Sequence, residues 1–421
     1  MTAGDTLVAT YKTISKCRIC GGTELTPVLS LGAQTLTGVF PKSKETEITS
    51  GPVDLVRCTA ASGCGLTQLK QSYDISEMYG ENYGYRSGLN ASMVRHLHAK
   101  VARIMAMGVL NDSDLIIDIG SNDATTLKAY PQGKYTLLGV DPSGGKFQSY
   151  YPQGVRLIAD FFSAKAISGA LGGKKAKVIT SFSMFYDLED PVAFASEIAQ
   201  SLDDDGIWVL EQSYLPTMLE MNSFDTVCQE HLEFYCLAQI RWLAEKVGLK
   251  IIDVEFNDVN GGSSSVVVAK KASTLRVATP AVKEVLDREA REKPDSLEAF
   301  AAFRGRVEEA GAELRQFLAD AKQKGKRVVG LGASTKGNVL LQYYGIGPDQ
   351  LSVIAEVNAD KFGSFTPGTL IPIAPEKEVL ASEPDYLLVL PWHFRDFFIK
   401  HPAFEGRKLV FPLPRLEIVE P

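Results

Sequence analysis

The 421-residue chain lacks the features that mark nucleic-acid-binding, secreted and membrane proteins. Its formal net charge is −7, and no run of lysine and arginine suggests a surface for polyanions. The first residues, MTAGDTLVATYKTISK, have no basic start followed by an apolar run, so they do not resemble a signal peptide. No stretch reaches the roughly 18 apolar residues that a membrane span needs. We therefore expect a cytoplasmic protein without a nucleic-acid or membrane partner.

Cysteine is scarce, with six residues in the whole chain, but four of the six form two pairs. These are Cys17 and Cys20 in CRIC, and Cys58 and Cys64 in RCTAASGCG. In a reducing compartment such pairs favour zinc, which prefers four tetrahedral thiolates. The second pair is wider than the usual spacing of about two to four residues, although Gly63 and Gly65 can shape a wider turn. Four protein ligands would make the zinc structural; the alternative is four buried small apolar side chains.

Three segments follow one another in the chain. Residues 1–80 hold the cysteine pairs, residues 81–271 alternate short apolar strands with helices, and residues 272–421 form a second α/β unit. Alternation of this kind predicts a doubly wound, largely parallel sheet. The runs LKIIDVEFND (249–258) and SSVVVAKK (264–271) can close that sheet as a hairpin. The last segment begins with a long helical stretch, about 280–324, with apolar residues at three- and four-residue steps.

A cofactor site is predicted beyond the carboxyl ends of the first strands of the middle segment. Gly120 follows the run LIIDIG, and Asp141 comes about 20 residues later, where an acid that binds ribose hydroxyls belongs. This acid suits both NAD and S-adenosylmethionine, but the G-x-G-x-x-G fingerprint of a pyrophosphate site is missing. S-adenosylmethionine is therefore favoured over NAD and over an empty fold. The proposed contacts are Gly120, Asn122, Asp123, Asp141 and Pro142, with Asp160, Phe161 and Phe162 near the adenine.

At this point the sequence resembles the bacterial C-methyltransferases that act on nucleotide-linked 4-ketohexoses in deoxysugar biosynthesis. The resemblance covers nearly the whole chain, and its motifs occur in a fixed order. They are CRIC with Cys58 and Cys64, YGYRSG (83–88), IDIGSNDATTL, GVDPS, ADFF, SFDTVCQEHLEFY, NGG (260–262) and GLGASTKG (330–337). The resemblance implies a zinc-binding domain, a class I methyltransferase domain and a C-terminal Rossmann-like domain.

The family resemblance also implies a reaction at C3 of the sugar. A base removes the C3 proton beside the keto group, and the resulting enolate attacks the sulfonium methyl group. His231, paired with Glu230, resembles the proposed base of the family, and Tyr85 resembles its tyrosine beside the enolate. Without the resemblance, a single histidine on a helix would more often be structural. From YGYRSG the resemblance adds Ser87 at the cofactor and Tyr83 and Arg86 at the substrate.

The sequence departs from the family pattern at three places. Cys228 stands where family members have a tyrosine, Asp187 lies in a loop where they have a histidine, and Asn260 replaces the histidine of a His-Gly-Gly motif. These changes leave open another sugar, another methylated atom, or deprotonation without methyl transfer.

The C-terminal motif GLGASTKG matches neither a Walker A motif nor G-x-G-x-x-G. Ser334, Thr335 and Lys336 at a helix start can hold the diphosphate of a nucleotide sugar, or the turn can be purely structural. We also expect Asn260 and Gly261 to contact the substrate. The rival functions are a nucleotide-sugar epimerase or isomerase and a binding protein with a decayed site. The expected assembly is a monomer or small homo-oligomer.

Overall fold

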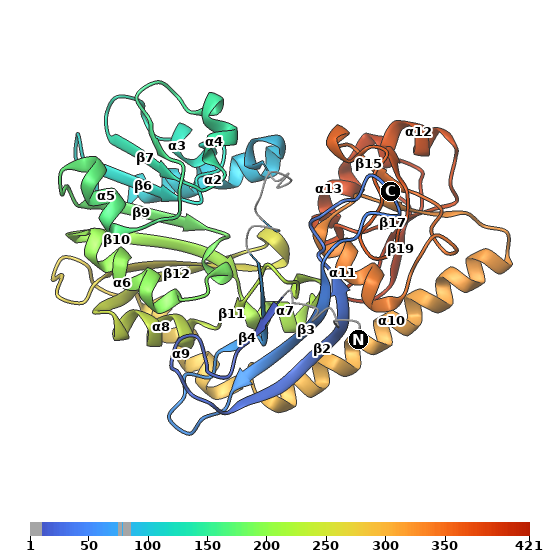
Figure 1. Ribbon diagram of the computed structural model, residues 1–421, viewed down its shortest axis with the longest axis horizontal. Coiled ribbons are helices and arrows are strands. Elements are labelled where there is room, and N and C mark those ends of the chain that lie inside the picture. Colours follow the sequence, from blue (N-terminus) through green and yellow to red (C-terminus); the bar gives the residue numbers. More distant parts are fainter. Residues whose placement is uncertain (1–10, 75–77, 79–85) are drawn as a thin grey trace, which may run out of the picture.

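The computed structural model describes residues 11–74, Met78 and 86–421. Figure 1 shows an N-terminal sheet in blue lying between a green α/β domain and an orange-to-red α/β domain. The long helix α10, Leu297–Gln323, runs along one side of this arrangement. Strand β2, Leu25–Thr35, contacts both α10 and helix α11, Thr335–Tyr344, so the N-terminal part is in contact with the C-terminal domain.

The middle domain contains a seven-stranded sheet in the order β12-β13-β10-β9-β6-β7-β8. All neighbouring strands pair in parallel except β13, which is antiparallel to both β10 and β12. The strand order reverses at β6, and its residues LIIDI are all buried, as expected for a sheet covered on both faces. The predicted closing hairpin is present. The strands are β6 Leu115–Ile119, β7 Thr136–Val140, β8 Arg156–Ile158, β9 Ala176–Phe182, β10 Leu202–Ser213, β12 Leu249–Asn257 and β13 Ser263–Lys270.

Helices cover this sheet on both faces, and two apolar clusters fill the space beneath them. The stretch SNDATTLKAY after β6 forms only the single helical turn α3, because the left-handed residues Asn122 and Ala124 hold the preceding segment in a loop. The helices are α2 Ala91–Ala106, α3 Thr125–Lys128, α4 Gly144–Phe147, α5 Ala164–Leu171, α6 Pro191–Ser201, α7 Leu215–Glu220 and α8 Leu237–Lys246.

The N-terminal part is a four-stranded antiparallel sheet in the order β11-β4-β3-β2. Its strands β3, Ser50–Cys58, and β4, Thr67–Leu69, belong to the N-terminal segment, but β11, Glu233–Phe234, comes from the middle segment. Glu233 pairs with Gln68. The short strands β1, Tyr11–Thr13, and β5, Gln71–Tyr73, pair beside this sheet. The segment that carries His231 is thus joined to the N-terminal sheet.

The C-terminal domain has a six-stranded sheet in the order β16-β15-β14-β17-β18-β19, parallel except for β19. The long helix expected at about 280–324 is two helices, α9 Pro280–Glu292 and α10. The chain breaks between them because Lys293 is left-handed (φ 47°) and a proline follows. The remaining elements are β14 Val328–Leu331, β15 Ile354–Glu356, β16 Ile373–Pro375, α12 Glu376–Ala381, β17 Tyr386–Val389, α13 Arg395–Lys400, β18 Leu409–Phe411 and β19 Glu417–Val419.

One apolar cluster joins the three parts, because it contains Leu55 of β3, Phe224 and Leu232 of the middle segment, and Phe303 of α10. The residues 223–236 are therefore enclosed where the three parts meet. Within the described ranges, no helix combines the length and hydrophobicity that a membrane crossing requires.

Candidate active site

The four predicted zinc ligands lie together. Their sulfur atoms are all within 4.8 Å of one another, with 3.5 Å between Cys17 and Cys64 and 3.5 Å between Cys20 and Cys58. A tetrahedral site with Zn–S bonds of about 2.3 Å separates its sulfurs by about 3.8 Å, so the arrangement fits zinc. Gly63 is required in the wide second turn, since a Cβ there would lie 2.8 Å from the Cys58 sulfur.

The predicted cofactor loop follows β6 at the point where the strand order reverses. Gly120 has a left-handed backbone (φ +73°), and its N–H donates to the carbonyl of Val140 at 2.8 Å. A Cβ at this position would meet the Met184 side chain at 3.3 Å. The loop thus keeps a backbone surface without a side chain, as a closely approaching ligand needs.

Asp141 follows β7 and holds the loop after β6 in place. One of its carboxylate oxygens accepts from the Asn122 N–H at 2.8 Å, and the other accepts from the N–H and hydroxyl of Ser143 at 2.7 and 2.6 Å. Ser87 and Gly88 then donate their N–H groups to Asn122 and Asp123 at 3.1 Å each. These bonds bring four of the predicted cofactor contacts, Ser87, Asn122, Asp123 and Asp141, into one network.

The two phenylalanines predicted near the adenine differ in their surroundings. The Phe162 ring packs against Phe194 with ring centroids 5.3 Å apart, whereas Phe161 is 59% exposed. The carboxylate of Asp160 accepts from the Phe161 N–H at 2.7 Å. Phe161 therefore offers the freer flat surface of the two.

Replacing Asp141 with alanine is expected to weaken S-adenosylhomocysteine binding by roughly 1.5–3 kcal/mol, the usual contribution of hydrogen bonds to a charged group. Calorimetry measures this, and the exposed Asp112→Ala serves as a matched control that should bind like the wild type. Equal affinities for Asp141→Ala and wild type would show that the acid does not reach the ribose. The same titration with NAD should give no binding heat.

Asp118 at the end of β6 is fully enclosed, and this burial raises its pKa to about 7, opposed by hydrogen bonds from Thr180 and Thr126. The folded protein therefore keeps a proton that the unfolded chain loses above about pH 4. The resulting stabilisation is complete at lower pH and disappears as the pH rises to about 7, with an upper bound of about 4 kcal/mol. Relative to Asp118→Asn, the Tm of the ligand-free protein should fall between pH 5 and pH 8; parallel curves would contradict this.

His231 lies in a turn before β11, not on the helix that its sequence context suggested. Its Nδ1 is 2.6 Å from the carbonyl oxygen of Thr226. A carbonyl can only accept, so Nδ1 carries the proton, and in the neutral ring the lone pair is on Nε2. The ring also meets Tyr186 edge-on, with centroids 4.6 Å apart. The histidine is thereby fixed in orientation and in the tautomer that a general base needs.

Glu230 is next to this histidine, and burial raises the pKa of its carboxyl group while His231 lowers it. Side-chain atoms of Cys228, Glu230 and His231 lie within 4.8 Å of one another. Gly38 of the N-terminal part comes so close that a Cβ there would be 2.6 Å from Glu230 Oε1. The N-terminal part thus forms one wall around the Glu-His pair.

Tyr83 and Tyr85 lie outside the described residues. Arg86, predicted to bind substrate, donates to the Tyr150 hydroxyl at 2.5 Å and lies 3.9 Å from Asp123. It is therefore in contact with the cofactor loop.

The predicted substrate residues of the C-terminal domain meet the middle domain. Lys336 Nζ donates to the carbonyl of Asn260 at 2.6 Å, and Gly261 is next to it with a left-handed backbone (φ +89°). The Ser334 hydroxyl caps α11 by accepting from the Gly337 N–H at 3.0 Å. The fold thus brings together Asn260, Gly261 and Lys336. Ser334 is the N-cap of α11, and Thr335 is the first residue of that helix.

Several neighbours of the site had no role predicted from the sequence, although Ser223 and Thr226 lie within the motif SFDTVCQEHLEFY. Thr226 contributes only its carbonyl, Gly38 only its missing side chain, and Ser223 and His393 reach the Asn260–Gly261 turn from different domains. Outside that motif, His393 carries a usable signal, since it follows the carboxyl end of β17.

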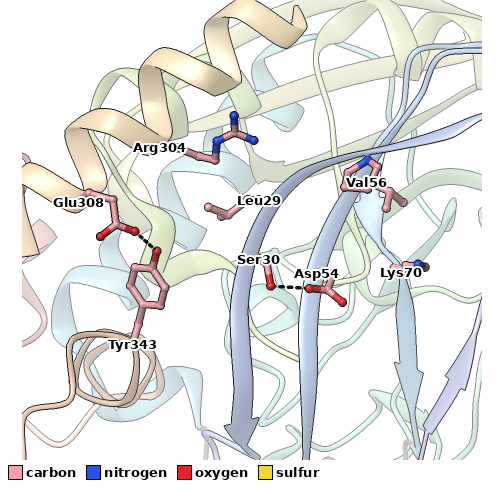
Figure 2. A pocket seen from close by; sticks show the side chains of 9 residues that line it. Leu29, Ser30, Asp54, Val56, Lys70, Arg304, Glu308 and Tyr343 are labelled. Carbon is pink, nitrogen blue, oxygen red and sulfur yellow. Dashed lines mark hydrogen bonds between the residues drawn. The ribbon is translucent and has the colours of Figure 1, made fainter.

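A groove of about 440 Å³ between β2, β3, α10 and α11 lies elsewhere (Figure 2). Ser30 donates to Asp54 at 2.6 Å and Tyr343 donates to Glu308 at 2.5 Å, so these polar groups are already paired. Its lining contains none of the predicted site residues. This groove is therefore not where the predicted chemistry lies.

Three protein families match the chain in order and without overlap. Residues 17–79 match a family described as "putative zinc binding domain", residues 90–254 a "methyltransferase domain" and residues 258–414 a "C-methyltransferase C-terminal domain". The chain is also 28% identical to C-methyltransferase NovU of Streptomyces niveus over 412 residues, which are 96% of this chain and 97% of that protein.

Two solved methyltransferases resemble part of the chain. The magnesium protoporphyrin IX methyltransferase of Synechocystis PCC 6803, with bound S-adenosylmethionine, is 17% identical over 42% of this chain and 79% of its own, with a TM-score of 0.32. An S-adenosylmethionine-dependent methyltransferase from Clostridium acetobutylicum ATCC 824 is 12% identical over 44% and 92%, with a TM-score of 0.32.

The order of the three family matches confirms the predicted class I methyltransferase fold with a zinc-binding N-terminal domain. The same matches confirm the predicted cofactors, S-adenosylmethionine and zinc. They favour an enzyme over the alternative function, a binding protein with a decayed site. The chain is therefore an S-adenosylmethionine-dependent methyltransferase whose three domains match these family models in order, and it is similar to C-methyltransferase NovU over nearly its whole length.

Proposed function

We propose that this C-methyltransferase acts on a nucleotide-linked 4-keto-deoxysugar and methylates C3 through an enolate, in the cytoplasm. The observation that carries the proposal is the His231–Thr226 hydrogen bond, which leaves the Nε2 lone pair available beside Glu230. A methyl group is added to carbon only when that carbon becomes a nucleophile, and loss of a proton beside a carbonyl achieves this. The sugar, its nucleotide and the choice of His231 as base come from the family resemblance, and the hydrogen bond to Thr226 supports that choice of base.

The proton transfer is assigned to His231. Nε2 takes the C3 proton, the C–H electron pair forms the C3–C4 double bond, and the carbonyl pair moves onto the C4 oxygen. When the carbonyl re-forms, C3 takes the methyl group and the S–C bonding pair stays on sulfur, which gives S-adenosylhomocysteine. The proton remains on His231, where the neighbouring Glu230 carboxylate stabilises the positive charge.

When bound, S-adenosylmethionine supplies an electrophilic methyl group. The chain contributes the loop after β6. Asn122 of this loop is fixed by two hydrogen bonds: its N–H donates to Asp141, and its side-chain oxygen accepts from the Ser87 N–H. The substrate would lie between this loop, His231 and the Asn260–Gly261 turn, because these are the predicted residues that the fold brings to the same end of the sheet. Such fixed positioning lowers the barrier by removing the search for a reactive geometry.

The test is incubation of the purified chain with methyl-labelled S-adenosylmethionine and a panel of 4-keto nucleotide sugars. We expect one sugar to gain about 14 Da, the mass of the added CH₂, and label at C3. A product of unchanged mass that incorporates deuterium from D₂O would favour an epimerase or isomerase instead. Label on oxygen or nitrogen would move the reaction to another atom, and no labelled sugar at all would overturn the proposed substrate class.

A further inference from the structure

Lys336 turns away from the glycine turn that precedes it and points to the middle domain. Its Nζ is 2.6 Å from the Asn260 carbonyl, and this is its single acceptor among the described residues. An ammonium group has three N–H donors, so two are left for other partners. Burial lowers the pKa of Lys336, whereas the nearby Asp225 and Cys228 raise it. Cys228 in turn lies beside Glu230 and His231.

Three polar side chains from separate segments surround Gly261. A Cβ at Gly261 would be 3.6 Å from Ser223 Oγ, 3.7 Å from His393 Cβ and 4.0 Å from Lys336 Nζ. We call Ser223, Lys336 and His393 the Gly261 cluster. Ser223 comes from the loop before the turn 228–231 that carries His231, which we call the catalytic turn. Lys336 comes from α11 and His393 from the loop after β17. The cluster therefore exists only because the two α/β domains are in contact.

The Gly261 cluster has hydrogen-bonding capacity that the protein does not use. Ser223 is 2% exposed, and neither its hydroxyl nor the Nδ1 of His393 has a hydrogen-bond partner in the part of the chain that the structure describes. Burial, followed by the charge of Lys336, lowers the pKa of His393 well below its usual value, so its ring is neutral. Unpaired polar atoms in a buried position cost about 1–3 kcal/mol each, which indicates that a polar ligand completes them.

A diphosphate at the glycine turn is a poor explanation for the position of Lys336. The carboxylate of Glu356, which is 7% exposed, accepts from the Ala333 N–H at 2.9 Å, and from the N–H groups of Val357 and Asn358 at 2.7 and 2.8 Å. This carboxylate thus occupies three backbone N–H groups near the turn, which are no longer available to a diphosphate. The ammonium is directed to the catalytic turn instead.

We propose that Lys336, assisted by Ser223, binds the substrate oxygen that becomes negative when His231 removes the neighbouring proton. This inference rests on the proposed enolate reaction and adds to it the group that stabilises the enolate. A fixed cation near the base matches the negative charge that develops on the oxygen as the proton leaves. No proton leaves Lys336: the oxygen gains an electron pair, receives hydrogen bonds, and returns the pair when C3 is methylated.

The test compares Lys336→Met, Lys336→Arg and Ser223→Ala with the wild type on the 4-keto nucleotide sugar that the wild type methylates. Lys336→Met should lower kcat by about 10²–10³-fold with KM within about threefold, the effect of losing one oxyanion donor. Lys336→Arg should restore part of kcat relative to Lys336→Met. Ser223→Ala disturbs folding less than Lys336→Met does, and it should lower kcat by a smaller factor. With S-adenosylhomocysteine in place of the methyl donor, exchange of the C3 proton in D₂O should slow in parallel.

Lys42→Met is the matched control, since its ammonium also donates to backbone carbonyls, those of Asp360 and Phe362 at 2.8 and 3.1 Å, which belong neither to the turn 228–231 nor to the Gly261 cluster. It should leave kcat unchanged. If Lys336→Met raises KM more than tenfold and leaves kcat and proton exchange intact, Lys336 binds the diphosphate and the oxyanion role is wrong. If the wild type methylates no member of the panel, the proposed function fails, and the enolate site with it.

Discussion

Replacing His231 with alanine is expected to lower turnover by about 10²–10⁴-fold, the usual contribution of a general base. S-adenosylhomocysteine should bind as before, because the cofactor loops after β6 and β7 make their hydrogen bonds without His231. The loss should appear in kcat and in C3 proton exchange in D₂O alike. Both measurements report the removal of the same proton, so a base must affect both.

His98→Ala is the matched control for this variant, because His98 is an exposed histidine on α2. It should keep wild-type turnover. If His231 only packs against Tyr186, its alanine variant should instead lose thermal stability and keep most of its specific activity. If proton exchange survives in His231→Ala but slows in Tyr85→Phe, the tyrosine is the base.

The alternation of strands and helices, the largely parallel sheet and its closing hairpin could be predicted from the sequence, and the sequence also suggested which loops hold the cofactor. Buried runs such as LIIDI have to be covered on both faces, and acids such as Asp141 follow them at the spacing of a cofactor site. These are local patterns, and each is readable within about 20 residues. The helix break at Lys293 was less visible, since amphipathic spacing continues on both sides of it.

The assembly of the site could not be predicted, because it depends on contacts between distant segments. The Thr226 carbonyl that orients His231, the close approach of Gly38 to Glu230, and the meeting of Lys336 with Asn260 involve backbone atoms or a missing side chain. Such groups are present at every residue of a chain and leave no pattern in its sequence. They become specific only when the fold brings them together.

The zinc-binding turn is also linked to the turn that carries His231, by contacts that the spacing of the cysteines does not reveal. Arg18, between Cys17 and Cys20, donates its backbone N–H to Gln68 at 3.0 Å and lies 3.7 Å from Glu233. Gln68 pairs with Glu233 across β4 and β11, and Glu233 is two positions after His231. Burial raises the pKa of the Glu233 carboxyl group, and the positive charge of Arg18 lowers it. The charged form of Glu233 is therefore stabilised by Arg18. The metal site therefore supports the strand that follows the proposed base His231.

Cys58→Ser is accordingly expected to lower the zinc content below one per chain and to reduce the Tm by on the order of 10 °C. Structural zinc contributes about 10–16 kcal/mol to folding in isolated zinc fingers, and a fraction of this is enough for such a shift. Metal analysis and thermal unfolding measure the effect, with Ser62→Ala in the same exposed turn as the control. Turnover should fall less than in His231→Ala, because the base remains and only its support is loosened. A variant that loses zinc but keeps its Tm would separate the metal from the fold, and full zinc content in Cys58→Ser would exclude this cysteine as a ligand.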